Sequence, residues 1–245
     1  MQIVTVFDPL TGLTASGSDA EFPAANLQQF EPWRRWWADA YDADAWLLVD
    51  RGAGAGSIDS AFLGNANFPS CRLQAHATNA WESPSVDILA APVVDNLGNR
   101  KGFFSLGTIS HRYLRLLIPV GQTLDAGEAA VPALGVLALG LAGSFPTVQK
   151  IGVKTLRPFS RGVTVSGRLR KWRVGAGVGR HVITIPQGDD WAAIRDFSLN
   201  WDLAVIAADL GSVGDAWLVY GADEDSRNAA WLEDADASIT LEEVA

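Results

Sequence analysis

Four aromatic residues close together near the start of the chain are the strongest candidates for ligand-binding chemistry. They are Trp33, Trp36, Trp37 and Tyr41, and they are flanked by arginine and aspartate. An aromatic ring beside polar groups is a common way to hold a sugar, because the ring is apolar while its neighbours reach hydroxyls. The same tryptophans are spaced at i, i+3 and i+4, which is typical of one helix face packing into a core. The sequence leaves the sugar platform and the core cluster as alternatives.

The rest of the sequence lacks the spacing of a catalytic, cofactor or metal site. Cys71 and His76 form the one close Cys/His pair, and their odd separation in a strand-like segment points them to opposite faces of a sheet. The glycine run at 175–180 reads G-x-G-x-G before a strand, whereas a dinucleotide loop needs G-x-G-x-x-G before a helix. We therefore expect no catalytic residue, no cofactor and no metal. An enzyme is the weakest hypothesis, because its carboxylates would have to converge in a cleft.

Charge is distributed unevenly along the second half. Residues 147–181 contain nine Lys or Arg and no acid, whereas residues 182–245 contain two basic and fourteen acidic residues. Such complementary strips either join neighbouring copies in an assembly or neutralise each other within one fold. The residues we predict for subunit contacts are Arg157, Arg161, Arg168, Arg170 and Arg173 on the basic side, and Asp223, Asp225, Glu233 and Asp234 on the acidic side.

Length and composition predict a folded all-β protein. The chain has 245 residues, 48% of them hydrophobic and 19% charged, with a net charge of −9. Its 24 glycines and 11 prolines separate short apolar runs, as in β-sandwiches. The acidity argues against a dedicated nucleic-acid binder, and neither a secretory signal nor a membrane span is expected. The expected strands cover residues 2–7, 45–50, 58–66, 70–77, 86–94, 102–106, 111–119, 132–141, 163–172, 180–185, 204–208, 215–220 and 238–242.

The pattern changes near residue 145, where Phe145-Pro146 follows the last strand of the first half. We predict two domains: a β-sandwich over residues 1–145 and a smaller β-rich domain over residues 146–245. In the second domain, apolar residues at 191, 194 and 197 predict one short amphipathic helix over residues 190–197.

Residues 22–77 resemble the opening of the galactose-binding-like (discoidin-type) β-sandwich. The segment Phe22-Pro23-Ala24-Ala25-Asn26-Leu27 is similar to that family's entry, and Trp46, Asp50 and Gly52 match its W-x-x-x-D-x-G strand. The resemblance implies a jelly-roll sandwich for the first domain. No ligand-binding residue is carried over from it.

Residues 131–172 resemble a segment common in tail proteins of tailed bacteriophages. There a strand ending in Leu-x-Leu-Gly, here residues 137–140, leads to Phe-Pro and then to a strand with arginines and Ser-Gly, here Ser166-Gly167. The resemblance implies a virion structural protein of the tail tip or baseplate, made in the host cytoplasm. It would form a ring with copies of itself and join the tail tube to hub and fibre proteins, without membrane insertion. The alternative is a carbohydrate-binding module for host-surface glycans.

Overall fold

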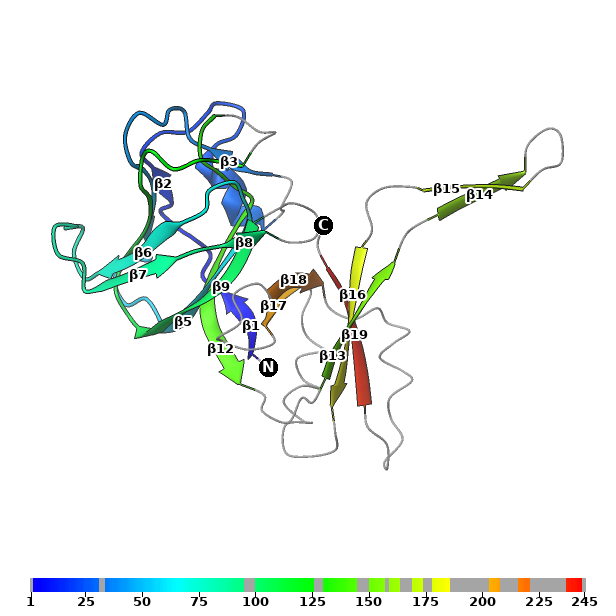
Figure 1. The fold of residues 1–245 in the computed structure, drawn as a ribbon. Coiled ribbons are helices and arrows are strands. Elements are labelled where there is room, and N and C mark those ends of the chain that lie inside the picture. The colour runs from blue at the N-terminus through cyan, green and yellow to red at the C-terminus, as the bar shows by residue number, and fades with distance from the viewer. Residues whose placement is uncertain are drawn as a thin grey trace. The chain divides into compact units, whose positions relative to one another are not determined.

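Figure 1 shows the chain as a computed structural model, in which it divides into two units. The first unit comprises Met1–Ser144 with Val205–Trp217, and the second comprises Phe145–Ala204 with Leu218–Ala245. The structure describes residues 2–30, 34–94, 100–125, 130–144, 150–156, 159–163, 169–173, 178–185, 203–207, 216–220 and 237–243. Side chains are described in residues 7–30, 34–94, 100–125 and 130–143 and at Val205.

The predicted all-β class is confirmed. The described residues form β-strands and one short 3-10 helix, η1 (Ala24–Gln29). No helix within these residues is long and apolar enough to cross a bilayer.

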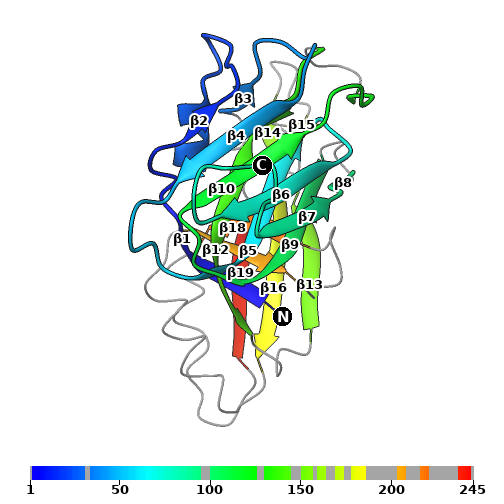
Figure 2. The same cartoon turned by 90° about the vertical axis from the view of Figure 1, so that its left-hand side faces the viewer.

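The first unit is a sandwich of two antiparallel sheets. One sheet has the strand order β17 (Leu203–Ala207), β1 (Gln2–Phe7), β12 (Val136–Ser144), β5 (Ile58–Ala66), β9 (Arg100–Ile109) and β8 (Val93–Val94). The five-stranded sheet has the order β2 (Thr14–Ala15), β4 (Ala45–Asp50), β10 (Tyr113–Ile118), β6 (Cys71–His76) and β7 (Val86–Ala90). Figure 2 shows the five-stranded sheet in front, with β5, β9 and β12 behind it. A two-residue pair, β3 (Trp36–Trp37) with β11 (Ala133–Leu134), adds to this unit.

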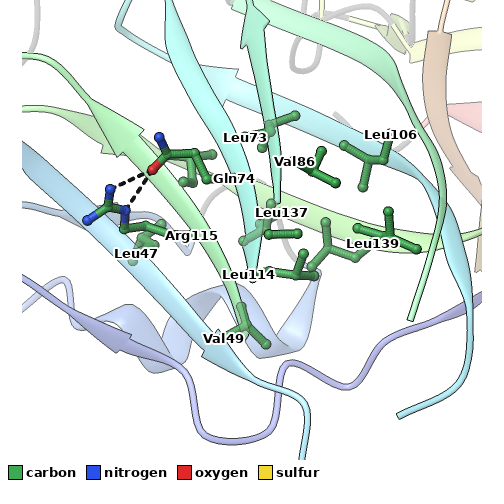
Figure 3. Close-up of a pocket in the computed structure, with 13 residues that line it drawn as sticks. Leu47, Val49, Leu73, Gln74, Val86, Leu106, Leu114, Arg115, Leu137 and Leu139 are labelled. Carbon is green, nitrogen blue, oxygen red and sulfur yellow. Dashed lines mark hydrogen bonds between the residues drawn. The ribbon is translucent and has the colours of Figure 1, made fainter. Parts of the chain in front are cut away.

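Alternation of apolar and polar residues explains how the two sheets face each other. In β4 and β10 every second residue is buried, and the buried set includes Leu47, Val49, Leu114 and Leu116. Successive side chains in a strand point to opposite faces, so this period of two turns one whole set inward. Figure 3 shows Leu47, Val49 and Leu114 with Leu137 and Leu139 of β12 around a small cavity, which Leu116 also lines. The cavity lies between the sheets and is lined almost wholly by apolar side chains, so it belongs to the core.

The second unit contains four neighbouring strands of the ten-stranded sheet and a separate hairpin. The four strands have the order β13 (Lys150–Leu156), β16 (Val178–Ile185), β19 (Ala237–Glu243) and β18 (Ala216–Tyr220). The hairpin pairs β14 (Phe159–Val163) with β15 (Leu169–Arg173). The prediction of one strand over residues 163–172 is therefore wrong, because Val163 and Leu169 are cross-strand partners. The helix predicted over residues 190–197 lies outside the described residues.

The sequence places a single domain boundary after residue 145. In the structure the later segment Val205–Trp217 also belongs to the first unit. The reason is strand pairing, because β17 lies antiparallel to β1 with Val4 opposite Val205.

Candidate ligand-binding face

The outward face of the five-stranded sheet carries a row of polar side chains. In the strand register Arg115 of β10 lies opposite Gln74 of β6, and Gln74 lies opposite Asp87 of β7. Cross-strand partners of this kind have neighbouring side chains on the same face of a sheet. The period of two that buries Leu114 and Leu116 therefore turns Arg115 outward, and the register places it beside Gln74.

Arg115 is held in one orientation by three contacts. Its Nε and Nη2 atoms donate hydrogen bonds to Oε1 of Gln74 at 2.8 and 2.6 Å. Its guanidinium carbon lies 4.5 Å from the centre of the Trp81 ring, which is a cation–π contact. Gln74 is 6% exposed, so its amide is a fixed acceptor. Figure 3 shows Arg115 and Gln74 joined to each other by the two hydrogen bonds.

A carboxylate extends this arrangement across the sheet. Arg72 donates to both oxygens of Asp87, from Nε at 2.8 Å and from Nη2 at 2.5 Å. The hydrogen bond from Arg72 lowers the pKa of Asp87, and a hydrogen bond from the Gln74 side chain lowers it further, while burial opposes both. We call the connected set Trp81, Arg115, Gln74, Asp87 and Arg72 the Trp81 network.

The loop between β6 and β7, residues 77–85, brings Trp81 onto the sheet. The indole Nε1 donates to Asn79 Oδ1 at 2.6 Å, which fixes the ring from within the loop. At the base of the loop, Nδ1 of His76 accepts a hydrogen bond from the Thr78 backbone N–H at 3.1 Å. The Trp81 side chain is partly exposed. The face therefore offers an aromatic ring next to planar polar groups of fixed geometry.

A second ion pair lies farther along the same sheet. Nε and Nη2 of Arg112 each lie 2.6 Å from an oxygen of Asp50, and the guanidinium lies 4.8 Å from the Tyr113 ring centre. The Arg112 hydrogen bond, helped by the Gly52 backbone N–H, lowers the pKa of Asp50 to about 2.

This pKa predicts a specific acid dependence of stability. The ionised form of Asp50 is favoured by folding, so its stabilisation is present above the unfolded-state pKa near 4 and is lost as the pH falls from there towards 2. We expect Asp50→Asn to be less stable than the native chain at pH 6. The two proteins should become equally stable near pH 2, which urea unfolding at a series of pH values measures. If the stability difference between Asp50→Asn and the native chain stayed constant with pH, it would contradict the lowered pKa of Asp50.

The four aromatic residues singled out in the sequence do not share one exposed surface among the described residues. Trp36 is fully buried, and its Nε1 donates to Ser18 Oγ at 3.0 Å. A fully buried ring offers no face to a surface ligand, so Trp36 belongs to the core. Its backbone is in strand β3 and not in the helix that the spacing allowed. Trp33 lies outside the described residues.

Trp37 and Tyr41 are occupied by contacts within the protein. Trp37 stacks on Phe22 with ring centres 4.1 Å apart, and its Nε1 atom is buried without a hydrogen-bond partner among the described residues. The Tyr41 hydroxyl donates to the carbonyl oxygen of Pro119 at 2.5 Å and accepts from the Gln122 backbone N–H at 3.3 Å. These contacts fix Trp37 within β3 and Tyr41 within the segment between β3 and β4.

The residues predicted for subunit contacts stay predictions. Arg161 lies in β14, and Arg170 and Arg173 lie in β15, where Arg173 is the cross-strand partner of Phe159. Their side chains are not among those described. The others lie outside the described residues: Arg157, Arg168, Asp223, Asp225, Glu233 and Asp234.

Cys71 and His76 lie at the two ends of β6, and Cys71 is fully buried. Burial raises the pKa of the Cys71 thiol to about 12, so the thiol is protonated and unreactive in the folded protein. Cys71 is therefore a core residue. In the part of the chain that the structure describes, no three His, Cys, Asp or Glu side chains are grouped to hold a metal ion.

Comparison with known proteins gives structural matches only. No protein-family model matches the chain, and no curated protein matches it. Similar solved structures include chitosan-binding module 1 from a chitosanase/glucanase of Paenibacillus sp. IK-5, with 17% identity, 52% of this chain and 92% of that chain covered, and a TM-score of 0.39. Another is the family 32 carbohydrate-binding module of C. perfringens NanJ in complex with galactose, with 14% identity, 57% and 98% covered, and a TM-score of 0.41.

A third is the family 32 module of AlyQ in complex with 4,5-unsaturated mannuronic acid, with 13% identity, 55% and 97% covered, and a TM-score of 0.40. Nothing in these matches points to a tail or baseplate protein. The assignment of this chain to the β-sandwiches rests on its own strand order, in which two antiparallel sheets enclose one apolar core.

Proposed function

We propose that the N-terminal β-sandwich is a carbohydrate-binding module and that the sugar binds on the outer face of the five-stranded sheet, over Trp81. The observation that carries this proposal is the Trp81 network, in which a partly exposed indole lies beside planar groups already fixed by hydrogen bonds. No covalent step is part of the proposed function. The chain would act by binding alone.

The chemistry of a sugar matches that of the network. A pyranose has an apolar C–H face, which packs on an indole, and a rim of hydroxyls, which pair with carboxylate, amide and guanidinium groups. Groups that are ordered before binding lose little conformational entropy when the ligand arrives. Gln74 is buried and Arg115 has two hydrogen bonds to it, so the polar side of this site is ordered in the free protein.

The test is a titration of the full chain with a panel of sugars, in which binding is measured by tryptophan fluorescence or by calorimetry. The panel contains chitotriose, galactose, mannuronate oligosaccharides and trigalacturonate, the first three being sugars bound in similar structures or closely related to them. We expect at least one to bind, and Trp81→Ala to weaken that binding at least tenfold, or about 1.4 kcal/mol. Trp81→Phe should retain part of the affinity because it keeps a ring.

Trp46 provides the matched control, since it is a partly exposed tryptophan on the same sheet outside the Trp81 network. Trp46→Ala should leave the affinity within about threefold of the native value, or roughly 0.6 kcal/mol. The proposal fails if no sugar in the panel binds at roughly ten-millimolar concentration, or if Trp81→Ala binds as well as the native chain.

The tail-structural role implied by the resemblance of residues 131–172 is a second proposal. The charge strips at residues 147–181 and 182–245 support it, because oppositely charged segments can join copies in a ring. The partners would be tail-tube, hub and fibre proteins, and the location would be the virion tail. Light scattering should show an oligomer that dissociates as ionic strength rises. A chain that is monomeric at every salt and protein concentration argues against it.

A further inference from the structure

Three arginines lie on or next to the five-stranded sheet, and their charges are not balanced equally. Arg72 is paired with both oxygens of Asp87, and Arg112 with both oxygens of Asp50. Arg115 instead contacts an uncharged amide and an aromatic ring. Among the described side chains, none supplies a carboxylate within 4.0 Å of its nitrogen atoms. Arg115 is therefore a fixed cation without a directly bound counter-ion in this part of the chain.

The geometry of Arg115 leaves bonding capacity for a ligand. A guanidinium has five N–H donors, and Gln74 takes two of them. Trp81 lies against one side of the guanidinium group, so the remaining donors lie next to the indole ring. Two parallel N–H groups are suited to a carboxylate, which accepts both at once.

Two carboxylates act on Arg115 from a distance without binding it directly. Burial lowers the pKa of Arg115, and the charges of Asp87 and Asp44 oppose that shift. Both carboxylates have other partners, since Asp87 binds Arg72 and Asp44 accepts from the Val120 backbone N–H at 2.8 Å. The net charge of −9 repels an anion only at long range, and physiological salt screens it beyond about 8 Å.

We infer that the ligand of this face is an acidic saccharide whose carboxylate pairs with Arg115 while its ring stacks on Trp81. This inference rests on the proposed function and narrows it to carboxylate-bearing sugars. A hexuronate and a sialic acid both supply this chemistry. Neutral sugars and amino sugars lack the group that Arg115 requires.

The experiment compares sugars that differ only in the carboxylate. The full chain is titrated with trigalacturonate and with its methyl ester, and separately with 3′-sialyllactose and with the methyl ester of 3′-sialyllactose. We expect the charged member of at least one pair to bind at least tenfold more tightly than its neutral form. The pair that shows the preference identifies the source of the carboxylate. Raising the salt concentration should reduce the preference, because the attraction is electrostatic.

Three variants test whether Arg115 causes the preference for the carboxylate form of the sugar. Arg115→Gln should bind both members of the pair equally, and Arg115→Lys should keep only part of the preference because an ammonium group lacks the planar fork. Arg112→Gln is the matched control, since it removes the same charge from an exposed arginine that already has a carboxylate partner, and it should keep the full preference. Protection of the Cys71 thiol shows that each variant is folded.

Each outcome has a distinct meaning. Equal binding of charged and neutral forms, lost in Trp81→Ala, overturns this inference but leaves the carbohydrate-binding function intact. A preference that survives in Arg115→Gln also overturns it, because the carboxylate must then bind elsewhere. Failure of every sugar to bind refutes the proposed function itself.

Discussion

Trp36→Ala is expected to lower the free energy of unfolding of the N-terminal unit by about 3–5 kcal/mol, the range for truncating a buried aromatic side chain. Trp36 is fully buried in the core, and its backbone pairs with Leu134 across β3 and β11. Its Nε1 atom also donates to Ser18 Oγ, so the substitution leaves a cavity and removes the partner of that hydroxyl. No other described tryptophan is fully buried.

The single cysteine provides the measurement. Cys71 is buried in β6 of the same unit, so a thiol reagent labels it only when this unit opens. The labelling rate in a urea series therefore reports the stability of the first unit even if the second unfolds separately. Trp37→Phe is the control, since it keeps the ring stacked on Phe22 and removes an indole N–H that has no partner. We expect that control to change stability by less than about 1 kcal/mol. A loss below about 1 kcal/mol in Trp36→Ala would show that the ring is not part of the core.

The second large effect is expected at the ion pair between Asp8 and Arg51. Nε of Arg51 lies 2.6 Å from Oδ2 of Asp8, and the two side chains are 3% and 8% exposed. Arg51 also donates to the carbonyl oxygens of His111 at 3.1 Å and Gly56 at 2.6 Å. Asp8→Ala leaves a buried charge without its counter-ion, which costs about 3–5 kcal/mol.

A double variant separates the stability lost with the ion pair from the cost of leaving Arg51 buried and unpaired. Asp8→Leu combined with Arg51→Met replaces both charges with apolar side chains, and we expect it to be at least about 1 kcal/mol more stable than Asp8→Ala alone. Asp87→Asn is the exposed comparison, because Arg72 is 43% exposed and can be solvated when its partner loses charge. That substitution should cost no more than about 1 kcal/mol. Cys71 labelling measures the stability of all three variants. If Asp8→Ala and Asp87→Asn lowered the free energy of unfolding equally, burial would not increase the cost of removing the carboxylate of Asp8.

Strands in which apolar and polar residues alternate clearly were predictable from sequence. Strands that exist only because a neighbouring strand pairs with them were not. The predicted strand over residues 45–50 coincides with β4, and residues 58–66 coincide with β5. The two-residue strands β2 and β3 are too short to have a period, and they exist because β4 and β11 pair with them. The expected strand over residues 86–94 divides into β7 and β8, which belong to different sheets. A sheet change of this kind depends on tertiary packing and has no local signal.

The candidate binding face shows the same limit. Alternation in residues 113–118 indicates that Arg115 points away from the core, but the identity of its neighbours depends on strand register. Register joins Arg115 to Gln74, a residue 41 positions earlier, and a loop then returns Trp81 onto the sheet. The spacing of Trp33, Trp36 and Trp37 drew attention to a different cluster, because nearby aromatic residues are visible in sequence whereas cross-strand rows are not.

The place of β1 between β12 and β17 has a consequence for biosynthesis. Gln2 pairs with Ser144 on one side and with Ala207 on the other, so after its own synthesis β1 has neither of these partners until roughly 140 more residues have been translated. At about 5–20 residues per second, this wait lasts on the order of 7–30 s. During that interval Ile3, Val4 and Val6 stay open to cellular chaperones, and a nascent chain stalled before residue 136 should be a good chaperone substrate.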